Sequence, residues 1–136
     1  MSDHLATVSA IYEAFGRGDV PAILDHLAGD VQWESWEDNS GQKAGVPWMI
    51  PRNDRDGVAE FFRVVATTLD IQEFRILALM GNDNQVAAEF VLEADVRTTG
   101  RHYRDEEMHL WTFNDQGKVV RFRHYLDTAK HIAATA

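Results

Sequence analysis

The second half of the chain consists of four segments rich in β-branched and aromatic residues, separated by short polar turns. The segments cover residues 71–80, 85–96, 101–113 and 118–126, and GNDN, TTG and NDQG lie between them. Turns this short join antiparallel neighbours, because parallel strands need a crossover of a dozen or more residues. We therefore predict a four-stranded antiparallel meander, which needs other elements to cover one of its faces.

The first half of the chain predicts helices that provide this cover. Residues 3–17 have apolar side chains at helical spacing, and a shorter helix is expected after the potential N-cap Asp19, with Gly29 as its stop. A third helix is expected to begin at Asn53 or Asp54, either of which can be its N-cap. Between the last two helices, residues 31–36 alternate apolar and polar residues as a half-buried strand does. This order indicates an α+β domain with three N-terminal helices packed on a curved, mostly antiparallel sheet.

Residues 37–53 contain two glycines and two prolines and show no sustained periodicity. A connection of this length without secondary structure is unusual in so small a domain, and such segments are often lids or rims. Trp48, Met49 and Ile50 would make this one apolar. We expect the segment to border a pocket.

Composition and charge limit the classes of function. A chain of 136 residues fits one domain, residues 1–136. Its net charge of −9, without a cluster of Lys and Arg, argues against nucleic acid as a partner. The apolar runs are far shorter than a membrane span, and the N-terminus lacks the features of a signal peptide. We therefore expect a cytoplasmic protein without a membrane partner. With no cysteine, disulfides and thiolate chemistry are excluded.

The last two predicted strands each carry a histidine among large apolar neighbours, His109 and His124. With a two-residue turn at the centre of NDQG, Glu107 faces His124 and His109 faces Phe122 across the hairpin. Alternation places these four side chains on one face. Because the aromatic side chains of the hairpin gather there, we assign this face to the pocket.

These residue types suggest acid/base chemistry. A carboxylate bonded to one imidazole nitrogen fixes the tautomer and leaves the other nitrogen free to take or give a proton. We predict that Glu107 and His124 form such a pair and that His109 polarises a carbonyl or enolate oxygen. The three catalytic candidates are thus His124, His109 and Glu107.

Two other interpretations of these three residues are open. Buried histidines satisfied by a carboxylate are common in proteins without catalysis, so the group can be purely structural. The same residues also contain the ligand set of a two-histidine, one-carboxylate metal site. We assign no function to His4, His26, His102 and His131, which are predicted at chain ends, on helix faces or on the opposite strand face.

Several aromatic residues at apolar positions are candidates for binding a substrate. The predicted pocket-lining set is Tyr12, Phe15, Trp33, Trp48, Phe61, Phe90, Trp111 and Phe122.

The chain resembles the nuclear transport factor 2-like superfamily and, within it, the SnoaL-like polyketide cyclases and ketosteroid isomerases. The resemblance is carried by IYEAFGRGDVPAILDHLAGDVQWE, DGVAEFF and HLWTFNDQGKVVRFRHYLD. It implies a cone-shaped half-barrel closed by helices, with an apolar pocket that uses no metal or other cofactor. It also implies a homodimer formed through the outer face of the sheet.

Within this superfamily, the cyclases compare better than the isomerases. The resemblance places Ile11, Ser35 and His109 at the three catalytic positions of the steroid isomerases, and none has the expected residue type. The cyclases have a histidine at the position of His109 and a catalytic aspartate at the position of His124. The resemblance therefore favours cyclase-like residues, with a histidine in place of the aspartate.

The leading hypothesis is a cofactor-free cyclase, isomerase or lyase that acts on a hydrophobic, oxygenated small molecule. The alternative is a module of the same fold that binds a small ligand or dimerises without catalysis. An enzyme requires both histidines to reach one cavity, whereas a binding or structural domain does not.

Overall fold

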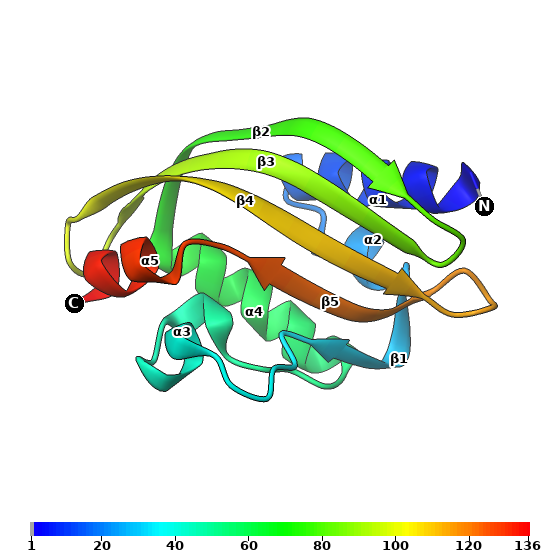
Figure 1. The fold of residues 1–136 in the computed structure, drawn as a ribbon, viewed down its shortest axis with the longest axis horizontal. Helices are drawn as coiled ribbons and strands as arrows, with labels where there is room; N and C mark the ends of the chain where they lie inside the picture. The colour runs from blue at the N-terminus through cyan, green and yellow to red at the C-terminus, as the bar shows by residue number, and fades with distance from the viewer. Residues whose placement is uncertain (1) are drawn as a thin grey trace.

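The four predicted strands of the second half form a continuous meander in the computed structural model, which describes residues 2–136 (Figure 1). The elements in chain order are α1 (Ser2–Gly16), α2 (Val20–Leu24), β1 (Leu27–Trp33), α3 (Ser40–Lys43), the 3₁₀ helix η1 (Pro47–Met49), α4 (Arg55–Thr68), β2 (Leu69–Gly81), β3 (Gln85–Val96), β4 (His102–Phe113), β5 (Val119–Tyr125) and α5 (Thr128–Thr135). Within residues 2–136 the strands form one sheet in the order β1-β5-β4-β3-β2. The only parallel pairing there joins β1 to β5. The predicted α+β fold is confirmed.

The helices lie where side chains and caps in the sequence favour them. Asp19 caps α2 by accepting a hydrogen bond from the backbone N–H of Ala22, and Asp54 caps α4 by accepting one from Gly57. Both caps match the prediction. Over the part of the chain that the structure describes, no helix is both long and apolar enough to cross a membrane.

The sheet curves around the helices and encloses the apolar core. Helix α1 packs on β2 and β3, while α4 packs on β1 and β2. Figure 1 shows the long strands β2, β3 and β4 arching over α1 and α4. Register shifts in β2, after Ile71 and after Ile76, mark bulges of the kind that bend a strand. This curvature gives the sheet a concave inner face.

The predicted pairing of the final hairpin is wrong by two residues. His109 pairs with His124, and Trp111 pairs with Phe122. The loop has three residues instead of two, with Gly117 in the left-handed conformation at φ 76°, and a bulge at Val120 adds a further residue. An error of two residues preserves the face of each side chain, because side chains alternate with a period of two. At the bulge the alternation is interrupted, so that Val119 is buried and Val120 is half-buried.

Three boundaries in the first half differ from the predictions. The strand expected over residues 31–36 spans Leu27–Trp33. It ends there because Glu34 adopts a left-handed φ of 59° and Trp33 pairs with Arg52 outside the sheet. The second helix is shorter than expected and ends at Leu24, since the chain enters β1 three residues later.

The segment 37–53 and the C-terminus contain helices that were not predicted. Helix α3 and η1 lie within residues 37–53, and both Trp48 and Met49 are buried. Helix α5 follows β5 and lies close to α3 (Figure 1). These elements close one end of the sheet, which the three predicted helices leave uncovered.

Glu34 is a fully buried carboxylic acid at the end of β1. Its Oε1 accepts hydrogen bonds from the backbone N–H of His124 at 3.1 Å and from the indole N–H of Trp36 at 3.0 Å. Its Oε2 has no hydrogen-bond partner among the described residues. Burial raises the pKa of Glu34 to about 6, although the charge of His124 and these hydrogen bonds oppose the shift.

We predict that Glu34→Gln stabilises the protein increasingly as the pH rises from 4.5 to 6. The native pKa lies above the unfolded value, so the wild type loses stability as the pH rises through this range. The loss should reach about 2 kcal/mol at neutral pH, the equivalent of a shift of about 1.5 pKa units. The amide oxygen of glutamine can still accept both hydrogen bonds.

Urea unfolding of wild type and variant between pH 4 and pH 8 measures this difference. The exposed Glu37→Gln removes the same charge nearby and should show no such trend. A difference between wild type and Glu34→Gln that stays constant with pH would contradict the prediction.

Candidate functional site

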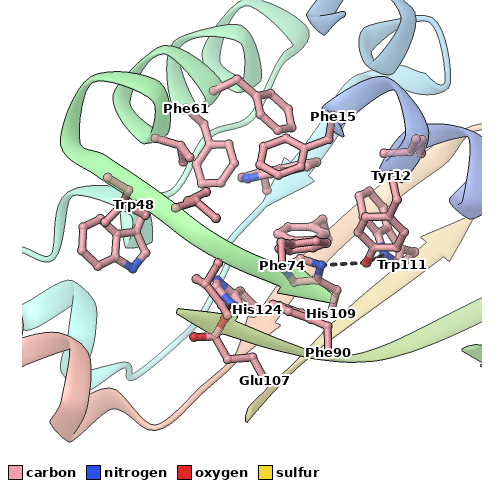
Figure 2. A pocket seen from close by; sticks show the side chains of 18 of the residues that line it. Tyr12, Phe15, Trp48, Phe61, Phe74, Phe90, Glu107, His109, Trp111 and His124 are labelled. Carbon is pink, nitrogen blue, oxygen red and sulfur yellow. Dashed lines mark hydrogen bonds and ion pairs between the residues drawn. The ribbon is translucent and has the colours of Figure 1, made fainter. Parts of the chain in front are cut away.

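The concave face of the sheet and the helices beneath it enclose a cavity lined by aromatic side chains (Figure 2). Its empty space is about 650 Å³, counting the part open to solvent. The eight aromatic residues predicted from the sequence all contribute to its wall: Tyr12, Phe15, Trp33, Trp48, Phe61, Phe90, Trp111 and Phe122. The three catalytic candidates Glu107, His109 and His124 also line it. The sequence analysis did not include Phe62, Phe74 and Tyr103, which complete the aromatic lining.

A chain of hydrogen bonds orients His109. The indole N–H of Trp111 donates to the Tyr12 hydroxyl oxygen at 3.0 Å, and that hydroxyl lies 2.7 Å from His109 Nδ1, the contact drawn in Figure 2. Since the hydroxyl oxygen already accepts from Trp111, its proton is free to be donated to Nδ1. This arrangement places the imidazole proton on Nε2.

Burial keeps both members of this contact uncharged. It lowers the pKa of His109 well below its usual value, with a further contribution from the charge of His124. Burial likewise raises the pKa of Tyr12, against the hydrogen bond from Trp111. His109 is therefore a neutral imidazole that offers an N–H donor.

His124 lies next to His109 and is bonded to a carboxylate. The two imidazole ring centres are 4.7 Å apart, and His124 Nε2 lies 2.5 Å from Glu107 Oε1. The other ring nitrogen, Nδ1, lies 3.7 Å from Glu34 Oε2, beyond hydrogen-bonding distance. The predicted contact between Glu107 and His124 is thus present, although the two residues lie diagonally rather than directly opposite each other.

The carboxylate of Glu107 also binds a second histidine from helix α5. His131 is fully buried, and its Nε2 lies 2.8 Å from Glu107 Oε2 and 3.0 Å from Asp105 Oδ2. The indole N–H of Trp48 donates to His131 Nδ1 at 2.9 Å. One buried network therefore joins β4, β5, α5 and the segment that carries Trp48.

The network determines the charges of its members. Burial raises the pKa of Glu107. The charge of His124 and the hydrogen bonds from His124 and His131 together lower this pKa by more than burial raises it, so the net shift is downward. Burial lowers the pKa of His131, while hydrogen bonds to Asp105 and Glu107 raise it more. The Trp48 indole opposes that rise because it can only donate and needs a lone pair on Nδ1. The hydrogen-bond pattern is that of a neutral His131 with its proton on Nε2.

His131, Asp105 and Glu34 were not among the site residues predicted from the sequence. His131, to which no function was assigned, lies in the buried network through its contacts with Glu107 and Asp105. A signal was present, because Asp127 precedes a run of good helix formers, TAKHIAAT, and is a common type of N-cap residue. A short terminal helix, however, does not show which side chain it buries.

Metal-ligand geometry occurs at one cluster within residues 2–136. Ligand atoms of Asp105, Glu107 and His131 lie within 4.8 Å of one another. His131 Nε2 lies between the two carboxylates and donates to both, so hydrogen bonding by itself explains their proximity. This cluster differs from the alternative considered from the sequence, which combined His109, His124 and Glu107. In that set, potential ligand atoms already make hydrogen bonds: His109 Nδ1 is bonded to the Tyr12 hydroxyl, and His124 Nε2 is bonded to Glu107 Oε1.

Solved structures similar to this chain share its fold over nearly the whole length. A nuclear transport factor 2-like protein of unknown function from Burkholderia pseudomallei is 27% identical, with a TM-score of 0.82 over 98% of both chains. A protein provisionally named a polyketide cyclase from Xanthomonas campestris is 23% identical, with a TM-score of 0.73 over 98% of this chain and 96% of the other. TerC, co-crystallised with polyporic acid, is 21% identical, with a TM-score of 0.77 over 96% of both chains.

No curated protein matches the chain in sequence. The model of the SnoaL-like domain family matches residues 8–122, which run from α1 into β5. The match includes the eight predicted aromatic residues of the cavity, Glu107 and His109, and ends two residues before His124. Together with the fold of the solved neighbours, this match confirms the resemblance drawn from the sequence, and the chain belongs to the SnoaL-like domain family.

Proposed function

We propose that this protein is an enzyme that uses acid/base chemistry on a hydrophobic, oxygenated small molecule, without a cofactor. The observation that carries the proposal is the pair of imidazoles on the cavity wall. One of them, His124, is bonded to a carboxylate, and the other, His109, is kept neutral by burial. These environments suit the two histidines to different roles.

The proposed reaction begins with proton removal next to a carbonyl group. His124 Nδ1 takes the proton from carbon, and the electron pair of the C–H bond moves onto the carbonyl oxygen to form an enolate. Glu107 stabilises the resulting imidazolium through its bond to Nε2. The N–H of His109 Nε2 donates to the enolate oxygen, a role that requires the neutral ring.

The enolate can then react in three ways without any further reagent. Reprotonation by His124 at another carbon gives isomerisation. Attack of the enolate carbon on a second carbonyl carbon closes a ring; the π electrons of that C=O bond move onto its oxygen, which takes the proton held by His124 and becomes a hydroxyl group. If the substrate carries a hydroxyl group on the next carbon, His124 protonates that group and water leaves. Cyclase, isomerase and lyase activities thus share one intermediate, and we propose the enolate as the common species.

Solved neighbours of the fold include proteins provisionally named polyketide cyclases. Their names support the proposed class of chemistry but do not identify a substrate, since one fold hosts many reactions. Dimerisation through the outer face of the sheet is part of the same proposal. Exposed Leu77 and Met80 on β2 and Tyr125 on β5 would contribute apolar surface to it.

The alternative is a binding module without catalysis. It is favoured by the position of His124 between Glu107 and Glu34, because a buried histidine between carboxylates is also a common structural arrangement. The two functions differ in whether removal of His124 affects a reaction or only the fold.

We predict that His124→Ala abolishes enolisation. The reaction can be followed with 2-tetralone in D₂O, where proton NMR measures deuterium exchange at the carbons next to the carbonyl group. The rate above background should fall at least about 100-fold, the usual contribution of a general base. His102→Ala removes an exposed histidine on the outer face and should leave the rate unchanged. Full exchange by a folded His124→Ala variant would rule out the assignment.

We also predict that Glu107→Gln lowers the exchange rate by about two orders of magnitude or more. Glutamine has nearly the same shape but cannot stabilise the imidazolium through its charge. The neighbouring Glu106 is exposed, so Glu106→Gln removes the same charge one residue away and should stay within twofold of wild type. Equal rates for the two variants would show that the Glu107 carboxylate has no part in the reaction.

A further inference from the structure

Two buried hydrogen-bond donors on the cavity wall have no partner within the described chain. They are the indole nitrogen Nε1 of Trp33 and the hydroxyl oxygen of Tyr103. The two residues are 1% and 5% exposed, respectively. Buried polar groups in folded proteins are nearly always hydrogen-bonded, so each of these needs an acceptor that residues 2–136 do not supply.

Trp33 is held too tightly to turn toward another acceptor. Its ring stacks on Phe122 with ring centres 3.9 Å apart and an interplanar angle of 20°. Phe61 and Trp111 pack on it at 5.3 Å and 5.8 Å between ring centres. The acceptor must therefore reach the indole from the cavity.

Tyr103 lies near the buried carboxylates, but its hydroxyl makes no hydrogen bond to either of them. Glu107 Oε1 and Oε2 are bonded to His124 and His131, and Asp105 Oδ2 accepts from both His131 and the backbone N–H of Asp127. Burial raises the pKa of Tyr103, and the charges of Glu107 and Asp105 raise it further. The hydroxyl consequently keeps its proton and remains a donor.

The polar groups at the cavity wall are therefore mostly donors. Trp33 offers an N–H, Tyr103 an O–H, and His109 an N–H on Nε2. A hydrocarbon ligand would leave all three unpaired and would gain no selectivity from them. A ligand with several acceptor oxygens would satisfy them.

We propose that Trp33 and Tyr103 are recognition residues that donate hydrogen bonds to two oxygen atoms of the ligand, which is an apolar compound with carbonyl or enolate oxygens at separate positions. A third ligand oxygen, the reacting one, would accept from His109, and only this part of the inference rests on the proposed function. The two oxygens bound by Trp33 and Tyr103 lie outside the reacting group and select the ligand.

Binding of two probes of similar size tests the proposal. Naphthalene has no acceptor oxygen, and 1,4-naphthoquinone has two on the same two-ring skeleton. The chain has no cysteine for the quinone to alkylate. Dissociation constants from isothermal titration calorimetry should show that the quinone binds the wild type at least about tenfold tighter, the effect expected of one or two hydrogen bonds.

The variant Tyr103→Phe should weaken quinone binding by about 2- to 12-fold, the range expected for one lost hydrogen bond. Naphthalene binding should not change. Tyr125→Phe removes a hydroxyl from an exposed tyrosine on β5 and should affect neither ligand. Trp33→Phe also removes packing, so its readout is the ratio of the two dissociation constants, which should fall toward one.

Thermal unfolding separates recognition from a structural role. Without ligand, Tyr103→Phe should melt at or above the wild-type temperature, because the hydroxyl that it removes has no partner. A lower melting temperature would mean that the hydroxyl stabilises the fold, and this would overturn its assignment as a ligand donor. Equal binding of quinone and naphthalene by the wild type, or an unchanged ratio in both variants, would also overturn the proposal.

The same probes distinguish this proposal from the proposed reaction. His124→Ala should lose deuterium exchange of 2-tetralone but keep its preference for the quinone. If the wild type catalyses no exchange yet discriminates the probes as expected, the reaction fails and the recognition residues stand. If exchange is catalysed but neither Trp33 nor Tyr103 affects the ratio, the recognition proposal fails alone.

Discussion

The site depends on one carboxylate shared between two imidazoles. Glu107 binds His124 through Oε1 and His131 through Oε2, and all three side chains are almost completely removed from solvent. A buried carboxylate is stable as an ion only when such bonds replace its hydration. The network therefore fixes the position of His124 in the cavity and also fastens α5, which carries His131, to the sheet.

The aromatic cavity determines the surroundings in which the two histidines act. Its wall is almost entirely apolar, so the two histidines on it respond to their immediate neighbours more than to solvent. Tyr12 and Trp111 fix the tautomer of His109 from one side, while Glu107 binds His124 from the other. Similar residues 4.7 Å apart thereby acquire different roles, which is the condition for one of them to move a proton while the other binds an oxygen.

Much of the fold was predictable because local patterns and tertiary structure agree. The caps Asp19 and Asp54 and the meander from β2 to β5 follow from residue types and short turns. The face assignment of Glu107 and His124 was right although the register was wrong, because the three-residue loop and the bulge displaced the pairing by two residues in total. An odd displacement would have placed the two side chains on opposite faces of the sheet.

The sequence by itself determined the class of fold, eight of the aromatic residues that line the cavity and the face on which Glu107, His109 and His124 lie, because these depend on periodicity and on short-range turns. Only the tertiary structure decided that His131 and Asp105 complete the network and that, within residues 2–136, the indole N–H of Trp33 and the hydroxyl of Tyr103 have no hydrogen-bond partner. His131 lies 24 residues from Glu107 along the chain, and no local pattern encodes a hydrogen bond across that separation. Whether a buried polar atom finds a partner depends on how α5, β1 and β4 pack together, and this is fixed only when the whole core is assembled.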